Sequence, residues 1–133
     1  MTVTLDGVLS AVQRVLVGVR ASGGSPIILI ASWAERDATR LTGAGYNATK
    51  RAVLALSETI NDEEGGNGIR STVIMPGEVA TDILMSRPVP PAKHDLERML
   101  QVDDLAETVR FVAEMPAPVR LDEILIPPRS AAR

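Results

Sequence analysis

Tyr46 and Lys50 are the two residues of this chain whose types and spacing fit acid–base chemistry. They stand four positions apart in a segment that predicts a helix, so their side chains share one face of it. A free phenol has a pKa near roughly 10, but a nearby ammonium favours the phenolate and lowers that pKa. Tyr46 could then exchange a proton with an alcohol or a carbonyl. The same spacing also fits an ordinary surface pair on a helix, and this interpretation stays open.

Ser32 is a third candidate, because it directly follows the apolar run Pro26–Ala31, which predicts a buried strand. Open α/β sheets bind their ligands at the carboxyl ends of their strands. A hydroxyl at that position could hydrogen-bond the same substrate oxygen as Tyr46. Taken alone, a serine at the end of a strand is more often a turn or capping residue.

A serine hydrolase using Ser32 and His94 is a competing hypothesis. The sequence Ile30-Ala31-Ser32-Trp33-Ala34 lacks the G-x-S-x-G turn that exposes a nucleophilic serine in α/β hydrolases. His94 lies next to a proline-rich segment that gives no reason for it to approach Ser32. The sequence therefore disfavours this hypothesis.

The composition predicts one domain with an aliphatic core. The chain has 133 residues, of which 45% are hydrophobic, with one each of Trp, Tyr and Phe. A chain of this length buries about two thirds of the surface that it exposes when extended, which suffices for one core. The chain has no cysteine, which excludes disulfide scaffolds and cysteine-ligated zinc, and the lone His94 argues against other metal sites. We expect a single domain spanning residues 1–133, with no metal.

The charge pattern disfavours nucleic acid and membranes as partners. The net charge is −3, and the arginines are scattered without forming a basic stripe. No stretch reaches the roughly 18 apolar residues of a membrane span, and no basic region precedes an apolar run at the N-terminus. These features predict a cytoplasmic protein that binds neither nucleic acid nor membrane.

Helices and strands are predicted to alternate along the chain. Apolar residues recur at helical spacing from Leu5 to Val19 and from Gly45 to Asn61, and Asp103 or Asp104 could cap a third helix. The strand candidates are Pro26–Ala31, Ile69–Met75 and Leu121–Ile126. This alternation is typical of an α/β fold in which helices cover both faces of a parallel sheet. The β-branched run before Ser32 predicts a strand buried on both faces.

Several segments, in order, resemble the short-chain dehydrogenase/reductases, nicotinamide-dependent enzymes with a Rossmann-like fold. The strand that ends in Ser32 is similar to the one that ends in the family's catalytic serine. The sequence Tyr46-Asn47-Ala48-Thr49-Lys50 is similar to the family's Tyr-x-x-x-Lys helix. Ile69–Gly77 resembles its next strand and Pro-Gly turn, and Glu78–Thr81 resembles the segment beside the nicotinamide.

The resemblance implies a role for each of these residues. Tyr46 would be the general acid/base, Lys50 would lower its pKa and hold the nicotinamide ribose, and Ser32 would orient the substrate oxygen. The backbone near Val79 and the hydroxyl of Thr81 would contact the nicotinamide carboxamide. The cofactor-binding residues would be Tyr46, Lys50, Pro76, Gly77, Val79 and Thr81.

The resemblance also implies the cofactor and the partners. The cofactor would be NAD or NADP, and the substrate a small alcohol or carbonyl compound. A homo-oligomer is expected, because the family packs the helices corresponding to Leu5–Val19 and Gly45–Asn61 against another subunit. The apolar stripe of the first of these helices fits equally well against the sheet of its own chain.

The sequence departs from the family in two ways. Nothing before residue 26 matches the strand, glycine-rich turn and helix that cradle the cofactor pyrophosphate. The sequence Gly43-Ala44-Gly45-Tyr46-Asn47-Ala48 fits G-x-G-x-x-A formally, but it overlaps the Tyr46 motif, and we interpret it as a loop and a helix start. Thr4 stands where the family usually has the asparagine of a proton relay.

These departures lead to four expectations. We expect a truncated Rossmann-like fold, with about three parallel strands and helices on both faces, that corresponds to the carboxyl-terminal half of the family's domain. Met1 is expected to be an internal or misassigned start. The chain alone is expected to bind the cofactor only weakly. The alternative function is that of a non-catalytic remnant or interaction protein that no longer binds cofactor.

Overall fold

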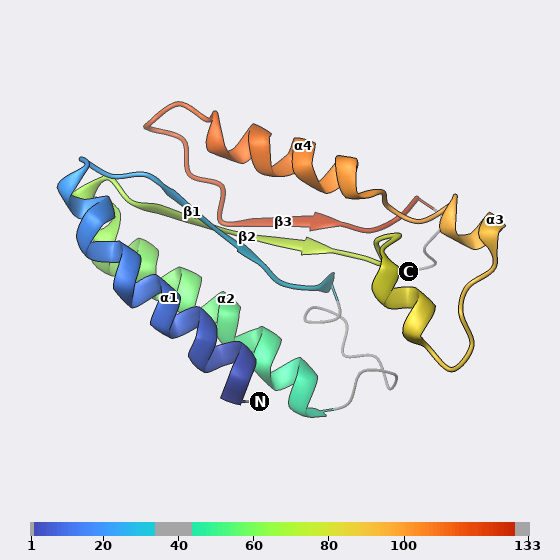
Figure 1. Cartoon of the computed structure of the whole chain (residues 1–133). Helices are drawn as coiled ribbons and strands as arrows, with labels where there is room; N and C mark the ends of the chain where they lie inside the picture. The colour runs from blue at the N-terminus through green and yellow to red at the C-terminus, as the bar shows by residue number, and fades with distance from the viewer. Residues whose placement is uncertain (1, 34–43, 130–133) are drawn as a thin grey trace.

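The computed structural model describes residues 2–33 and 44–129, with the side chains of residues 2–4, 44–47 and 50 left out. Three parallel strands carry helices on both faces (Figure 1). The predicted Rossmann-like α/β fold is thereby confirmed. In chain order, the elements are α1 (Thr2–Ala21), β1 (Pro26–Ile30), α2 (Ala44–Glu64), η2 (Gly65–Asn67), β2 (Arg70–Pro76), η3 (Asp82–Ser86), α3 (Lys93–Leu96), α4 (Val102–Ala113) and β3 (Glu123–Ile126).

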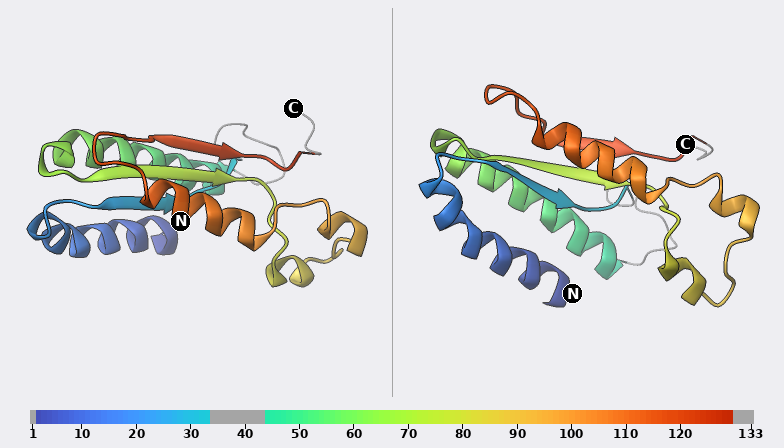
Figure 2. Two further views of the ribbon diagram at one scale, coloured as in Figure 1. Left: turned by 90° about the horizontal axis from the view of Figure 1, so that it is seen from above. Right: turned by 45° about the horizontal axis from the view of Figure 1, so that its top comes forward.

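The sheet has the order β1-β2-β3, and both neighbouring pairs are parallel. The register places Ile27 beside Ser71 and Val73 beside Glu123. Helices α1 and α2 lie on one face of the sheet and α4 lies on the other (Figure 2). Because parallel strands need a crossover between them, each helix returns the chain to the start of the next strand. All three strands therefore end at the same edge of the sheet.

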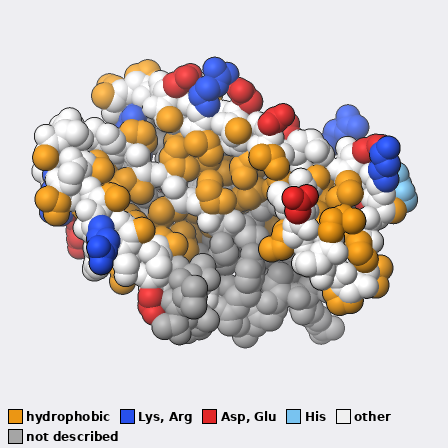
Figure 3. Space-filling view, viewed as in Figure 1, with side chains coloured by type: hydrophobic (Ala, Val, Ile, Leu, Met, Phe, Trp, Pro, Cys, Tyr) orange, Lys and Arg blue, Asp and Glu red, His pale blue; other side chains and the backbone are white. Residues whose placement is uncertain are grey.

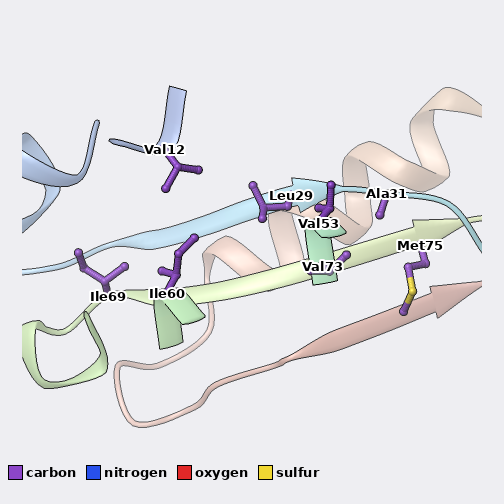
Figure 4. Close-up of a cluster of buried hydrophobic side chains, with 8 residues drawn as sticks. All are labelled: Val12, Leu29, Ala31, Val53, Ile60, Ile69, Val73 and Met75. Carbon is purple, nitrogen blue, oxygen red and sulfur yellow. The ribbon is translucent and has the colours of Figure 1, made fainter. Parts of the chain in front are cut away.

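The main core lies between the sheet and the helices α1 and α2 (Figure 4). Alternate residues of a strand point to the same face, so Val73 and Met75 of β2, like Ile69 just before it, point toward these helices. The cluster contains Val12, Leu29, Ala31, Val53, Ile60, Ile69, Val73 and Met75. The stripe of α1 packs on this core through Val12, with Val8, Leu16 and Val19 partly buried against it. One face of α1 therefore covers its own chain.

Asn61 takes the place of a strand residue beside the start of β2. Its side-chain Nδ2 donates to the backbone oxygen of Ser71 at 2.9 Å, and its Oδ1 accepts from the backbone nitrogen of Ser71 at 2.7 Å. These backbone groups face the side of β2 where β3 has not yet begun, since β3 first pairs with β2 at Val73. A buried peptide group needs a partner, and the Asn61 carboxamide supplies both a donor and an acceptor.

Two glycines bring the turns before β1 and β2 into contact. Gly24 has a φ of 97° and Gly68 a φ of 76°, which are left-handed conformations that favour glycine. A Cβ added to Gly24 would lie 2.3 Å from the carbonyl oxygen of Gly68. Any larger residue at position 24 would therefore have to separate the two turns.

Arg20 and Glu64 form an ion pair beside these turns, between the ends of α1 and α2. Arg20 Nε donates to Glu64 Oε2 at 2.7 Å, and its Nη2 contacts Glu64 Oε1. Asn67 Nδ2 donates to Glu64 Oε2 at 2.9 Å. The hydrogen bonds from Arg20 and then Asn67 lower the pKa of the buried Glu64 carboxyl to about 2. The two residues are 44 positions apart, so no local sequence pattern marks this pair.

Two local predictions are corrected by the structure. The strand β1 is not buried on both faces, because Ile30 on the face opposite the main core remains 46% exposed and Leu29 is the only residue of the strand that is buried. The N-cap of α4 is Gln101, whose backbone nitrogen donates to Asp104 Oδ2 at 2.7 Å, so neither Asp103 nor Asp104 is the cap. The segment after β2 contains the short helices η3 and α3, which lie on either side of the proline-rich residues 88–91.

None of the helices within residues 2–33 and 44–129 combines the length and the apolar character needed to span a membrane.

Candidate functional site

The ends of β1 and β2 bring several of the predicted site residues to one edge of the sheet. Ala31 continues the ladder beyond β1 by donating its backbone N–H to the carbonyl of Ile74 at 2.8 Å, and the half-buried Ser32 follows it. Pro76 ends β2, and the backbone nitrogen of Gly77 donates to the carbonyl of Ile126 at 2.8 Å. Ser32 and the Pro76-Gly77 turn therefore share the carboxyl edge, where α/β folds bind ligands.

Helix α2 starts near this same edge (Figure 1). The backbones of Tyr46 and Lys50 lie in the first two turns of α2, so the helical spacing predicted for them is present. Their side chains lie outside those that the structure describes. Thr49, between them, is buried. The catalytic roles of Tyr46 and Lys50 remain predictions.

Gly77 is required by packing. A Cβ at this position would lie 2.5 Å from Cδ of Pro128, in the segment that follows β3. Because a proline ring cannot move aside as a flexible side chain can, only glycine fits here. The Pro-Gly turn thus fixes the path of the chain as it leaves β2 and enters residues 78–81.

An isolated bridge between Val79 and Leu100 fixes the segment that follows the turn. Ala80 N donates to Leu100 O at 2.8 Å, and Leu100 N donates to Glu78 O at 3.2 Å. Because successive peptide groups of an extended chain point in opposite directions, the N–H and C=O of Val79 itself point away from Leu100.

The outward face of Val79 matches the hydrogen-bonding groups of a primary carboxamide. One backbone donor and one backbone acceptor lie on the same residue, and a carboxamide offers one group of each kind in return. The hydroxyl of Thr81 is exposed and donates to the Val79 carbonyl oxygen at 3.4 Å. The N–H and C=O of Val79 and the Thr81 hydroxyl therefore fit the nicotinamide carboxamide that the sequence led us to expect here.

An ion pair that the sequence did not reveal closes the loop beyond this segment. Arg87 Nη1 donates to Glu78 Oε1 at 2.9 Å, with both side chains about half exposed. Nine positions separate the two residues, which is no helical or strand spacing, so no periodic signal could have identified the pair. It connects the residue after Gly77 to the end of η3.

The structure gives no support to a serine hydrolase. His94 lies on α3 with 75% of its side chain exposed, and its Nε2 is 3.2 Å from Asp95 Oδ1. Among the side chains that are described, no group of three or more His, Cys, Asp and Glu residues is placed to hold a metal ion.

Comparison with known proteins identifies the family. The sequence model of the short chain dehydrogenases matches residues 1–90. The chain is 34% identical over 135 residues to an uncharacterized oxidoreductase of Mycobacterium tuberculosis, covering 95% of this chain and 52% of that protein. It is 32% identical over 132 residues to the glycine betaine reductase of Emericella nidulans, covering 96% of this chain and 10% of that protein.

Solved structures agree with this match. The crystal structure of a β-ketoacyl-[ACP] reductase from Bacteroides thetaiotaomicron superposes with a TM-score of 0.77 at 27% identity, covering 95% of this chain and 50% of that one. This chain belongs to the short-chain dehydrogenase family. It spans about half the length of the bacterial oxidoreductase and of the reductase structure.

Proposed function

We propose that this chain carries the catalytic part of an NAD- or NADP-dependent oxidoreductase that acts on an alcohol or carbonyl compound. The observation that supports this function is the arrangement at the carboxyl edge. Ser32, the start of α2 and residues 76–81 come from three separate segments and lie at the same edge of the sheet. When bound, the nicotinamide supplies the hydride chemistry.

Proton transfer is assigned to Tyr46. Its hydroxyl exchanges a proton with the substrate oxygen, and the ammonium of Lys50 lowers its pKa so that this exchange is possible near neutral pH. Ser32 donates a hydrogen bond to the same oxygen and so orients the substrate. Lys50 also holds the nicotinamide ribose.

Residues 76–81 are proposed to hold the nicotinamide end of the cofactor. The N–H and C=O of Val79 pair with the carboxamide, assisted by the Thr81 hydroxyl. The Pro76-Gly77 turn, packed against Pro128, keeps this segment in place. These contacts involve only the nicotinamide group, which NAD and NADP share, so they do not select between the two cofactors.

Residues 1–133 are proposed to form one unit that corresponds to the carboxyl-terminal half of the family's domain. Within residues 2–33 and 44–129, β1 pairs only with β2, so the backbone groups along its other edge have no strand beside them. An open edge of this kind accepts a further parallel strand.

Leu9, Val15 and Val17 are exposed on α1, and we propose that they support self-association of the chain.

A non-catalytic interaction protein is the second candidate function. Thr4 favours it, because this residue replaces the asparagine of the family's proton relay. An interaction protein would retain the surfaces of α1 and of the sheet edge without turning over a substrate.

The variant Tyr46→Phe separates the two functions. In an oxidoreductase, this change removes the transferable proton and lowers kcat/KM by about 10²–10⁴-fold, while the melting temperature stays close to that of the wild type. Oxidation of NADPH or NADH by a panel of ketones provides the assay. Equal turnover of both proteins would remove Tyr46 from the mechanism, and a complete absence of turnover in the wild type would favour the interaction protein.

A further inference from the structure

We propose that the peptide bond between Asn67 and Gly68, in the turn before β2, is a site of spontaneous deamidation, and that the product separates the turns before β1 and β2. The reaction consumes only water and needs no enzyme. The site lies away from the proposed chemistry, because these turns are at the amino ends of the strands and the candidate site is at their carboxyl ends (Figure 1).

The two residues provide both reacting groups. The backbone nitrogen of Gly68 attacks Cγ of Asn67. The new N–Cγ bond closes a succinimide ring, the Cγ–Nδ2 bond breaks, and Nδ2 leaves as ammonia with the proton released by the Gly68 nitrogen. Water then opens the ring at either carbonyl carbon, which gives aspartate or isoaspartate. A following glycine hinders this attack least, because it has no Cβ, and Asn67 is the one asparagine of the chain that precedes a glycine.

Solvent reaches the reacting groups. Residues 65–68 are all exposed, so water can attack the ring once it has formed. In the space-filling view, atoms of the backbone and of side chains that are neither hydrophobic nor charged lie at the surface at this end of the molecule (Figure 3). Asn61, by contrast, is only 7% exposed. Among the asparagines whose side chains are described, exposure and a following glycine therefore coincide at Asn67.

Two hydrogen bonds hold these groups in an unreactive arrangement. The backbone nitrogen of Gly68, which is the attacking atom, donates to the carbonyl oxygen of Gly65 at 3.1 Å. The carboxamide of Asn67 is held by Glu64, because its Nδ2 donates to Oε2 of Glu64 at 2.9 Å. Both bonds have to open before the nitrogen can reach Cγ, so the reaction proceeds through local opening of this turn.

The product no longer fits the turn from which it forms. In aspartate, an oxygen replaces the Nδ2 that donated to Glu64, so two carboxylates face each other and repel. Isoaspartate adds a methylene to the main chain directly before Gly68. Gly68 has no room to shift, because a Cβ at Gly24 would lie 2.3 Å from its carbonyl oxygen. Either product therefore pushes the two turns apart.

Peptide mapping by mass spectrometry tests the site in the full chain. The protein is incubated in warm, mildly alkaline buffer, with and without urea. The fragment that contains Asn67 is followed for the mass gained when an amide becomes an acid. Conversion in the folded chain is expected to be slower than in urea by a factor on the order of ten or more, because both hydrogen bonds have to open first.

A pair of variants tests the restraint by Glu64. Glu64→Gln is expected to speed conversion in the folded chain about threefold to tenfold, because a neutral acceptor holds the Asn67 carboxamide less tightly than a carboxylate does. The control Glu63→Gln removes a charge from the exposed residue before it and is expected to leave the rate unchanged. Rates are compared under conditions in which circular dichroism shows each variant to be folded.

Urea unfolding measures the effect on the two turns. Asn67→Asp reproduces one product, whereas Asn67→Ala removes the hydrogen bond to Glu64 without adding a charge. The urea midpoint is expected to be lower for Asn67→Asp than for Asn67→Ala. The wild-type protein is expected to shift toward the midpoint of Asn67→Asp as the incubation proceeds.

The opposite results would overturn these assignments one by one. If Asn67 stayed intact in the folded chain while the chain in urea reacted, the turn would not open and the site would be refuted. Equal rates with and without urea would rule out the restraint by Glu64 and Gly65. Conversion that leaves the urea midpoint unchanged would overturn the effect on the two turns.

Discussion

Replacing Asn61 with alanine is expected to destabilise the protein strongly, although Asn61 lies far from the proposed chemistry. The change leaves the N–H and C=O of Ser71 without their partners at a position that is 0% exposed. Each buried polar group left unsatisfied costs about 1–3 kcal/mol. Alanine favours a helix by about 0.5 kcal/mol more than asparagine does, which offsets a small part of this cost. The net loss is therefore about 2–5 kcal/mol.

Urea unfolding followed by circular dichroism measures this loss as a lower midpoint with an unchanged slope. The variant Thr59→Ala is a matched control, because it removes an exposed bond from Thr59 Oγ1 to Ala55 O on the same helix and is expected to change stability by less than about 0.5 kcal/mol. If Asn61→Ala were as stable as this control, the carboxamide would not act as a strand substitute and the reasoning would be refuted.

The variant Asn61→Asp refines the test. An aspartate can still accept the N–H of Ser71, but when ionised it cannot donate to the carbonyl, and it lies close to Asp122, whose Oδ1 is 3.4 Å from Asn61 Nδ2. Protonation restores a donor. The stability deficit of Asn61→Asp is therefore expected to shrink as the pH falls below neutral, and a deficit that does not change with pH would contradict the proposed contacts.

Two further predictions concern the turns and the ion pair beside them. Gly24→Ala is expected to destabilise the protein by more than about 1 kcal/mol, because its Cβ would meet the Gly68 carbonyl. Gly7→Ala on α1 is the control and is expected to stabilise the protein by about 0.5–1 kcal/mol, because its Cβ meets nothing within 4 Å. Thermal unfolding compares the two variants, and equal effects would contradict the close approach of the two turns. The pKa of Glu64 is lower in the folded state, at about 2, than its ordinary value of 4.5, so its stabilising contribution is complete above the ordinary value and is lost as the pH falls toward 2. Glu64→Gln is expected to reduce the loss of stability over this range, measured by urea unfolding at several pH values, and an unchanged pH profile would exclude the ion pair with Arg20 as its source.

The elements with strong apolar periodicity were predictable from the sequence. Helical spacing identified α1 and α2, and β-branched runs identified β1 and β2, because local periodicity is set by the geometry of helices and strands. The exposure of Ile30 was not predictable, because it depends on how much of the sheet face opposite α1 and α2 is covered. The short helix η3 was missed, since five residues are too few to show a period.

Contacts between distant residues could not be read from the sequence. The pairs Arg20–Glu64 and Asn61–Ser71 join segments that the fold brings together, and no local pattern marks either pair. For the candidate site, the order of the segments around Ser32, Tyr46 and Gly77 was informative, since each segment carries a motif of its own. The packing reason for Gly77, which is the approach of Pro128, required the structure.

Calorimetric titration of the 133-residue chain with NAD(H) and NADP(H) tests the central claim most directly. The account predicts saturable binding of at least one of these cofactors below the millimolar range, weakened about threefold to tenfold in Thr81→Val by loss of one hydrogen bond. An absence of binding up to millimolar cofactor would contradict the account and would leave Ser32, Tyr46 and Lys50 without a reaction in this chain.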